Sequence, residues 1–314
     1  MNKLKVLVTG CGGDIGQSIG KILKTRSDLF SVVIGADLHL DHAGKFIFDQ
    51  CLVISKCDSQ DYQKMVFEII QNHSIDIVIP ISEPELRKIT LNNHQDNYFG
   101  KPVIIANQLA REIGFDKKAT AEFLFSNHLP FPKTYLISEY DEGIFPVLIK
   151  SRTGSGSKSI HLVNNGEEIS RFKYIYPDFI VQEYLNGEDG EFTCGLFRSN
   201  KGEIRDIIFN RKLMGGFSGF GTRQNHPIIS EFLHQLAIVL GLRGSINIQL
   251  RVVNNQPIVF EINPRFSSTV LFRHLMGFED LIWSIQDKLD LPLSTYTINQ
   301  SITNFYKGFN EYVD

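Results

Sequence analysis

Three oxygen-bearing side chains stand at strand spacing near the end of the chain: Gln249, Glu261 and Asn263. Side chains alternate between the two faces of a strand, so Glu261 and Asn263 share one face, and Gln249 can lie beside them on a neighbouring strand. Mg2+ prefers hard oxygen ligands and keeps contacts to substrate phosphates, so few protein groups suffice. These three residues are the predicted metal ligands, with Mg2+ as the expected ion and Mn2+ as an alternative.

A lysine, Lys150, ends an apolar run and is followed at once by a segment rich in glycine and serine. Its ammonium can reach a phosphate, and small residues let backbone amides fold over a phosphate chain. Ser155, Gly156 and Lys158 are the loop residues expected to take part. The spacing differs from that of a Walker A loop. A plain hairpin turn is the alternative interpretation.

A second glycine-rich loop lies near the N-terminus, between a predicted strand and a predicted helix. Gly12, Gly13 and Asp14 stand where backbone N–H groups and a helix N-terminus can hold a substrate anion. The glycines also fit a tight turn, or the loop of an NAD-dependent sugar-nucleotide epimerase or dehydratase. Such enzymes need a Tyr-x-x-x-Lys pair, and no tyrosine of this chain has lysine four residues later.

Strands and helices alternate in the first third of the chain. Apolar runs at 5–9, 32–36, 75–79 and 103–105 predict strands, and helical periodicity separates them, which favours a parallel, doubly wound α/β domain. After residue 113 the pattern changes to α+β. A helix is expected near 116–127, and antiparallel hairpins are expected at 144–149 with 158–163 and at 244–252 with 256–262.

Composition narrows the class of protein. With 314 residues and a net charge of −3, the chain lacks the basic field that holds nucleic acid or an anionic membrane. No apolar stretch reaches membrane-spanning length, and the N-terminus shows no signal core, so a cytoplasmic location is expected. The four cysteines have no paired metal-ligand spacing and are expected to be reduced thiols.

Taken together, these segments resemble the ATP-grasp superfamily. The sequence is most similar in plan to one synthetase unit of the carbamoyl phosphate synthase large chain and to single-copy carboxylate-amine ligases. The resemblance covers nearly the whole chain, because residues 75–83 also look like that family's pre-grasp domain. It implies a Rossmann-like pre-ATP-grasp domain at 1–112, a small lobe with the phosphate loop at 113–185, and a large lobe with the metal site and C-terminal helices at 186–314.

The resemblance also assigns nucleotide-binding roles. It implies that Lys117 and Lys150 contact ATP phosphates and that Arg265 meets the γ-phosphoryl group during transfer. The implied adenine and ribose residues are Glu183, Tyr184, Leu185 and Glu191. Many family members carry an acidic metal ligand where this chain has Gln249. The metal is therefore expected to depend mainly on Glu261, with a weaker second metal.

Residues 210–223 combine cations with many glycines and are predicted to form a mobile substrate loop. Arg211, Lys212 and Arg223 are expected to clamp a carboxylate or another anion, and closure would exclude water from a reactive intermediate. Arg211 and Lys212 are also the catalytic candidates beside Arg265. Arg273, on a following helix, is expected to extend this positive wall.

The reaction implied by the resemblance is ATP-dependent ligation of a small-molecule carboxylate to an amine, through an acyl phosphate. A single grasp unit disfavours carbamoyl phosphate synthesis, which resembles a tandem pair. Two alternatives stay open beside it: the nicotinamide-dependent enzyme above, and a nucleotide-binding protein that keeps the fold without turnover. A homodimer is possible.

Overall fold

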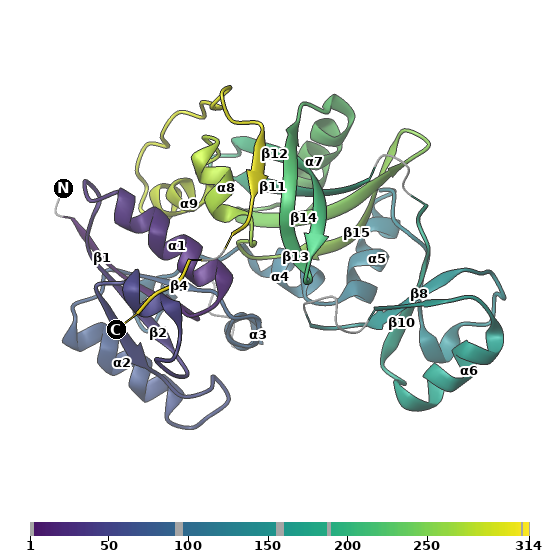
Figure 1. Cartoon of the computed structure of the whole chain (residues 1–314), viewed down its shortest axis with the longest axis horizontal. Coiled ribbons are helices and arrows are strands. Elements are labelled where there is room, and N and C mark those ends of the chain that lie inside the picture. The colour runs from purple at the N-terminus through teal and green to yellow at the C-terminus, as the bar shows by residue number, and fades with distance from the viewer. Residues whose placement is uncertain (1–2, 92–96, 155–159, 187–189, 309, 314) are drawn as a thin grey trace.

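The computed structural model describes residues 3–91, 97–154, 160–186, 190–308 and 310–313. Figure 1 shows three parts in chain order: an N-terminal unit around β1, a small lobe around β8 and β10, and a large lobe around β11 to β15. The large lobe lies between the other two in this view. The predicted combination of a parallel α/β part with an antiparallel α+β part is confirmed.

The N-terminal unit is a parallel sheet in the order β3-β2-β1-β4. Alternate residues of β1 enter different cores: Val6 and Val8 pack in the cluster that contains α1 residues, and Leu7 packs in the one that contains α2 residues. Its elements are β1 Leu4–Thr9, α1 Asp14–Thr25, β2 Phe30–Asp37, the short helix η1 Ala43–Phe46, β3 Gln50–Val53, α2 Tyr62–Asn72, β4 Ile77–Pro80 and α3 Glu83–Leu91.

The prediction of a fourth strand at residues 103–105 is wrong. The chain instead forms a two-stranded ribbon of β5 Asn97–Tyr98 and β6 Lys101–Pro102, and Val103 makes a single parallel bridge to Val78. Residues 103–105 are therefore apolar because they are buried beside the sheet, although they do not form a full strand.

The small lobe is an antiparallel sheet in the order β7-β10-β8-β9. The predicted hairpin of 144–149 with 158–163 is confirmed as β8 with β9. The predicted helix is confirmed as α5, whose N-cap Asp116 accepts hydrogen bonds from the backbone N–H groups of Lys118 and Ala119. This stretch of chain begins with α4 Gln108–Gly114 and α5 Lys117–Ser126, which pack against the large sheet. The remaining elements are β7 Thr134–Leu136, η2 Ile137–Glu139, β8 Val147–Ser151, β9 Ile160–Val163, α6 Gly166–Ile175 and β10 Phe179–Glu183.

The large lobe is an antiparallel sheet in the order β15-β14-β11-β12-β13-β16. The second predicted hairpin is confirmed as β14 with β15, joined through Asn254 and Asn255, whose φ angles of 50° and 61° fit the left-handed turn region. Its elements are β11 Glu191–Arg198, β12 Ile204–Met214, β13 Phe217–Gln224, α7 Pro227–Val239, β14 Gly244–Val253, β15 Gln256–Asn263, α8 Val270–Leu275, α9 Asp280–Lys288 and β16 Asn304–Tyr306.

The predicted mobile loop at 210–223 is instead a hairpin. β12 and β13 pair from Ile208 with Gln224 to Met214 with Phe217, with a register shift between Lys212 and Leu213, and Gly215 and Gly216 form the turn. Glycines 219 and 221 sit inside β13, where a Cβ at 221 would come within 2.4 Å of the Phe305 ring. These glycines therefore permit close packing rather than mobility.

One face of the large sheet changes character along β11. Glu191 and Thr193 are polar, whereas Gly195 and Phe197, on the same face by strand alternation, meet the buried cluster that holds Phe278 and residues of α9. The opposite face is covered by α4, α5 and α7. The C-terminal helices thus cover half of the first face and leave its polar half open.

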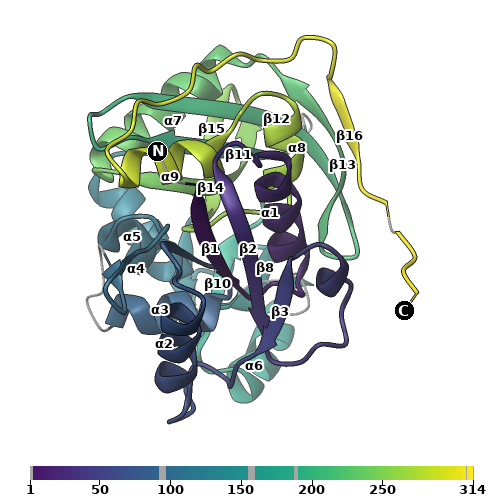
Figure 2. The ribbon, with the colours of Figure 1, turned by 90° about the vertical axis from the view of Figure 1, so that its left-hand side faces the viewer.

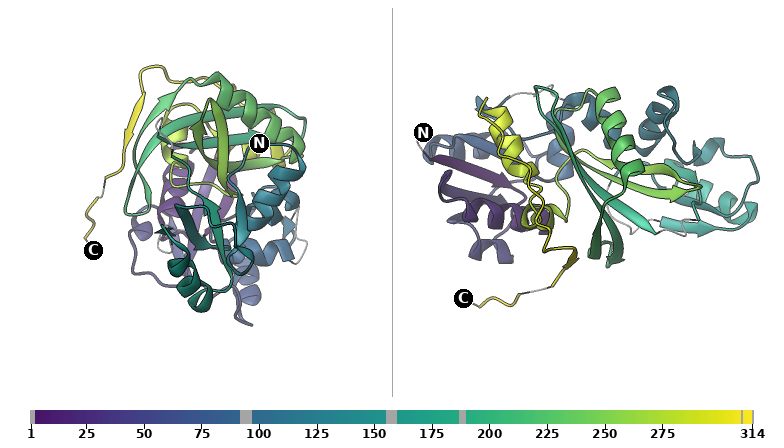
Figure 3. Two further views of the ribbon diagram at one scale, coloured as in Figure 1. Left: turned by 90° about the vertical axis from the view of Figure 1, so that its right-hand side faces the viewer. Right: turned by 90° about the horizontal axis from the view of Figure 1, so that it is seen from above.

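The C-terminal segment returns from the large lobe to the N-terminal unit. β16 pairs with β13, Lys307 makes an ion pair with Asp14 at the start of α1, and the Tyr312 ring stacks on Phe46 at 4.9 Å between centroids. Figure 2 shows this yellow strand running beside β13, and Figure 3 shows the tail leaving the body of the fold. Within the described ranges, no helix combines the length and apolar content that a membrane span needs.

Candidate active site

A cavity of about 940 Å3 is lined by all three parts of the molecule. The small lobe contributes the end of β8 and the segment after β10, the large lobe contributes the open face of β11, β14 and β15, and the N-terminal unit contributes the β1–α1 loop. Most predicted site residues line it: Gly13, Asp14, Lys117, Lys150, Glu183, Tyr184, Leu185, Glu191, Arg211, Gln249, Glu261, Asn263 and Arg265.

The oxygen-bearing residues lie together as their strand spacing predicts. Gln249 is the cross-strand partner of Glu261, and Asn247 is the partner of Asn263, with a register shift just after Gln249. All four line the cavity. This set of carboxylate and amide oxygens on one face suits a hard divalent cation such as Mg2+. Metal binding by these residues stays a prediction.

Lys150 is a cation buried at the cavity wall. Only 5% of the residue is exposed, its Nζ donates to the Phe260 carbonyl at 3.3 Å, and the same atom lies 5.5 Å from the Phe260 ring centroid. Burial lowers the pKa of Lys150 from its ordinary 10.5 to about 8, and nearby Lys117 acts in the same direction while Glu261 opposes it. A phosphate placed here would relieve this unfavourable burial of charge.

Lys117 lies at the first turn of α5, next to the phosphate-loop segment. Its Nζ donates to the Gly154 carbonyl at 2.9 Å, and its backbone N–H donates to the Arg152 carbonyl at 3.0 Å. Arg152 is tied in turn to Asp116 by an ion pair of 2.7 Å. The predicted loop residues Ser155, Gly156 and Lys158 lie outside the described residues.

The connector after β10 leads from the small lobe to the large lobe. The Glu183 carboxylate accepts from the backbone N–H of Lys133 at 3.1 Å, and the Leu185 carbonyl accepts from Arg251 Nη1 at 2.7 Å. Tyr184 is 38% exposed and, like both neighbours, faces the cavity. Glu183 and Leu185 are thus fixed by these bonds while the segment lines the cavity, and a role in holding adenine stays a prediction.

Glu191 is held between two arginines. It accepts from Arg211 Nη2 at 2.6 Å and pairs with Arg251 Nη2 at 3.3 Å, and Arg211 Nη2 also donates to Gln249 Oε1 at 2.7 Å. Arg211 is almost fully buried, whereas Glu191 is partly accessible. Through Arg211, the network joins the predicted ribose-binding residue Glu191 to the predicted metal ligand Gln249.

Arg251, Asn247 and Thr193 line the cavity but were not predicted. Arg251 and Asn247 flank Gln249 at two-residue spacing on β14, so strand alternation alone could have identified them. Thr193 is the neighbour of Gln249 on β11, and its hydroxyl donates to Asn247 at 2.9 Å. That cross-strand pairing has no local signal in the sequence.

Arg265 follows β15 directly and stands at the junction of the large lobe and the N-terminal unit. Its Nη1 donates to the Phe266 carbonyl at 3.0 Å. Burial lowers the pKa of Arg265, and the carboxylates of Glu83 and Glu261 oppose that effect.

Two of the cationic residues predicted to bind substrate, Lys212 and Arg223, do not line the cavity. Lys212 is exposed, beside Arg211 on β12, and strand alternation directs it away from the cavity. Arg223 on β13 bonds to Gln300 at 3.3 Å and is not among the cavity-lining residues. Both expectations are corrected: of the three cations in the predicted loop, only Arg211 reaches the cavity.

Arg273 does not extend a positive wall. It is fully buried, pairs with Asp280 at 3.2 Å, and donates to Asn247. A helical residue that faces a packed sheet is desolvated unless it finds such a partner. Arg273 therefore supports Asn247 from behind rather than contacting a substrate.

The N-terminal glycine loop serves packing as well as the cavity. Gly10 has a φ of +69°, and a Cβ at Gly16 would lie 2.3 Å from the Gly10 carbonyl oxygen, so both positions need glycine for the turn. Gly13 caps α1 and, with Asp14, lines the cavity. Gly12 does not line it, because its N–H turns to Asp37 Oδ2 at 2.7 Å.

Two family models match this chain over adjoining ranges. One, described as an ATP-grasp domain, matches residues 115–269, and the other, described as a PylC-like N-terminal domain, matches residues 6–104. The chain thus carries an ATP-grasp domain at residues 115–269 and a PylC-like N-terminal domain at residues 6–104.

Comparison with individual proteins agrees with these matches. The carbamoyl phosphate synthase large chain of Thermus thermophilus is 25% identical over 144 residues, which are 41% of this chain and 14% of that protein. Among solved structures, an ADP complex of N5-carboxyaminoimidazole ribonucleotide synthetase has a TM-score of 0.75 at 14% identity, covering 95% of this chain and 80% of that one. An L-amino acid ligase from Bacillus licheniformis has a TM-score of 0.68 at 15% identity, covering 92% and 75%. The two structures show a shared fold.

Proposed function

We propose that this chain uses ATP and Mg2+ to join a small-molecule carboxylate to an amine through an acyl phosphate. The observation that carries the proposal is the single cavity in which buried Lys150 of the small lobe faces the Glu261 and Asn263 oxygens of the large lobe. A cation on one wall and hard oxygen ligands on the other suit a polyphosphate with its metal.

The predicted nucleotide residues would act mainly by binding and orienting. Lys117 and Lys150 would hold phosphate oxygens, the Glu183–Leu185 connector would hold adenine, and Glu191 would hold the ribose hydroxyls. Mg2+, held by Gln249, Glu261 and Asn263, supplies neutralisation of phosphate charge when it is bound. Arg211 already bonds Gln249, so a shift of that guanidinium would accompany metal binding.

Arg265 would stabilise the phosphoryl group during transfer, as a fixed bidentate cation does for charge spread over phosphate oxygens. A carboxylate oxygen attacks the γ-phosphorus, and the bond to the β-phosphate oxygen breaks to release ADP. The amine nitrogen then attacks the acyl carbon, phosphate leaves with the bonding electron pair, and the amine loses a proton to solvent. The product is an amide.

The cavity end formed by the N-terminal unit would take the acceptor. Gly13 at the N-terminus of α1 offers a backbone donor, and the Asp14 carboxylate, which already pairs with Lys307, would have to share its second oxygen with a substrate ammonium group. The structurally similar proteins include an N5-carboxyaminoimidazole ribonucleotide synthetase and an L-amino acid ligase, so both amines and amino acids belong in a substrate screen.

The direct test is an ADP-release screen of carboxylates crossed with amines, followed by mass detection of the condensed product. We expect ADP release only when both partners and Mg2+ are present, and a product mass equal to both substrates minus water. The Glu261→Gln variant should lose this release, whereas Lys201→Met, at an exposed turn, should keep it. If Glu261→Gln does not change ADP release with any substrate pair, the cavity does not turn ATP over. That result would favour a protein that binds nucleotide without turnover.

Separate titrations with ATP and NAD(H) address the nicotinamide alternative. Binding of Mg-ATP without NAD(H) is expected from the cavity, and tight NAD(H) binding with none for ATP would overturn the proposal. Metal titrations of Glu261→Gln and Gln249→Ala then rank the ligands. We expect the larger loss at Glu261, because a carboxylate brings charge that an amide lacks.

A further inference from the structure

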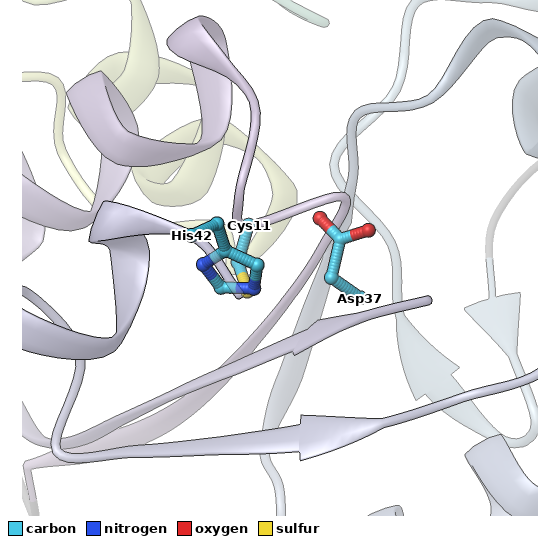
Figure 4. A group of neighbouring side chains, drawn as sticks. All are labelled: Cys11, Asp37 and His42. Carbon is cyan, nitrogen blue, oxygen red and sulfur yellow. The ribbon is translucent and has the colours of Figure 1, made fainter. Parts of the chain in front are cut away.

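A second polar cluster lies at the edge of the N-terminal sheet, on residues that the proposed ligase reaction does not use. Cys11 comes from the β1–α1 loop, Asp37 from the end of β2, and His42 from the segment before η1 (Figure 4). One ligand atom of each residue lies within 4.8 Å of the other two. We propose that these three side chains bind a zinc-like divalent cation.

The spacing fits a tetrahedral transition-metal site after a small contraction. Zinc bonds to sulfur at about 2.3 Å and to imidazole nitrogen at about 2.0–2.1 Å, which places the two ligand atoms roughly 3.5 Å apart at a tetrahedral angle. Cys11 Sγ and His42 Nε2 are 3.9 Å apart. The Asp37 carboxylate would have to move toward the other two ligand atoms. Its side chain is only half-buried, which leaves room for that movement.

The imidazole of His42 is held in a slot that two glycines create. A Cβ at Gly12 would come within 2.5 Å of His42 Cδ2, and a Cβ at Gly44 would come within 2.9 Å of His42 Nδ1. Any larger residue at either place would push the ring away from Cys11. The loop composition therefore preserves the contact between thiol and imidazole, independently of the turn that Gly10 and Gly16 form.

The hydrogen bonds around the cluster orient its ligand atoms, and the bond between the Cys11 and Cys51 thiols is one that a metal would replace. Asp37 Oδ2 accepts from the Gly12 N–H at 2.7 Å, and Oδ1 accepts from the Leu38 N–H at 2.7 Å, which orients the carboxylate and keeps lone pairs free. His42 Nδ1 is buried and has no hydrogen-bond partner among the described residues. This ring is not part of an ordinary polar core network.

The ligand types select the cation. A thiolate with an imidazole favours zinc over Mg2+, which requires oxygen ligands, so this site differs in chemistry from the Gln249, Glu261 and Asn263 face. Asp37 also lines the large cavity, which gives an entry path and room for a water as fourth ligand. On binding, the Cys11 thiol would lose its proton to solvent as the metal–sulfur bond forms.

A metal here would brace the loop that carries Gly13 and Asp14 into the cavity. The β1–α1 loop and β2 are already joined by a hydrogen bond from the Cys11 N–H to the Ala36 carbonyl at 3.3 Å, and the metal would tie the segment leading to η1 to this pair. The expected role is structural. Binding should therefore protect the N-terminal unit without requiring ATP, so the test is separate from the proposed ligase activity.

The test is cobalt and zinc binding to the full chain, in a phosphine reductant that keeps Cys11 and the adjacent Cys51 reduced. Wild-type protein should bind one Co2+ with a thiolate-to-cobalt charge-transfer band, and Zn2+ should displace it. Cys11→Ser should abolish that band, and His42→Gln and Asp37→Asn should each weaken Co2+ binding by at least about tenfold. Far-ultraviolet circular dichroism of every variant confirms that it is folded.

Two matched variants serve as controls. Cys57→Ser removes a partly buried thiol outside the cluster, and His39→Gln removes the histidine whose ring centroid lies 5.8 Å from that of His42. Both should keep the cobalt band and the affinity. The proposal is overturned if wild-type protein shows no thiolate band, if folded His42→Gln and Asp37→Asn bind Co2+ as tightly as wild type, or if Cys57→Ser loses the band.

Discussion

Lys150→Met tests whether the buried lysine is kept for a ligand at a cost in stability. The native pKa of about 8 lies below the ordinary 10.5 because burial disfavours the charged form. At about 1.4 kcal/mol for each pH unit, the charged lysine costs about 3 kcal/mol at pH 7. Methionine fills similar space without charge, so the ligand-free variant should be more stable there by about 1–3 kcal/mol, allowing for the lost bond to Phe260.

The pH dependence has a definite sign. Between about pH 8 and 10.5 the unfolded chain binds more protons at Lys150 than the native protein does, so this residue makes wild-type stability rise with pH in that window. The advantage of Lys150→Met should fall by about 2 kcal/mol between pH 7 and pH 9.5. Lys201→Met, at an exposed turn, should show neither effect.

Urea unfolding at pH 7 and pH 9.5, without and with Mg-ATP, measures the free energy of unfolding of the ligand-free protein and its increase on ligand binding. Saturating ligand at a hundred times its Kd should stabilise wild-type protein by about 2.7 kcal/mol, and Lys150→Met should gain much less. If Lys150→Met is less stable than wild type at pH 7, and the difference is unchanged at pH 9.5, then the reasoning that Lys150 is held desolvated is wrong.

Two further substitutions probe the arginine contacts around the sheet. Glu191→Gln leaves Arg211 and Arg251 facing each other without a carboxylate, and we expect a loss of about 1–3 kcal/mol in urea unfolding together with weaker ATP binding by calorimetry; unchanged values would show that the network is dispensable. Arg273→Met strands the buried Asp280 carboxylate, and we expect a loss of about 3–5 kcal/mol that Asp280→Asn partly restores in the double variant; a loss under 0.5 kcal/mol, on the order of a surface substitution, would contradict this account.

Local patterns in the sequence account for much of the fold. Alternation in residues 247–263 placed Gln249 opposite Glu261, because a hairpin closed by Asn254 and Asn255 fixes the register of its two strands. The apolar runs of β1 and β2 likewise predicted a parallel sheet. In both regions the side-chain period and the turn chemistry act within a few residues of one another.

The errors arise where distant segments decide the outcome. Glycines 219 and 221 suggested a mobile loop, yet both lie in β13, where a Cβ at Gly221 would meet the Phe305 ring of the returning C-terminal segment and one at Gly219 would meet Met214. Arg273 was expected to face a substrate, but α8 packs against α1, Arg273 lies against Gly195 of the large sheet, and Asp280 from the next helix neutralises it in the core. Such partners are set by tertiary packing and leave no local signal.

The cavity itself combines both kinds of information. Lys150, Glu261 and Asn263 could be predicted from their positions near strand ends. Arg251 was not predicted, although it continues the alternation of Asn247 and Gln249. The Arg211 bond to Glu191 depends on β11 and β12 lying side by side. Register between strands far apart in the sequence therefore limits what can be predicted for the site.

A crystal structure with Mg2+ and a non-hydrolysable ATP analogue tests the central claim most directly. The account predicts one analogue in the cavity, with phosphate oxygens contacting Lys150 and a metal ion shared between those oxygens and the side chains of Glu261 and Asn263. An analogue bound elsewhere, or one that touches only one of the two lobes, would contradict it.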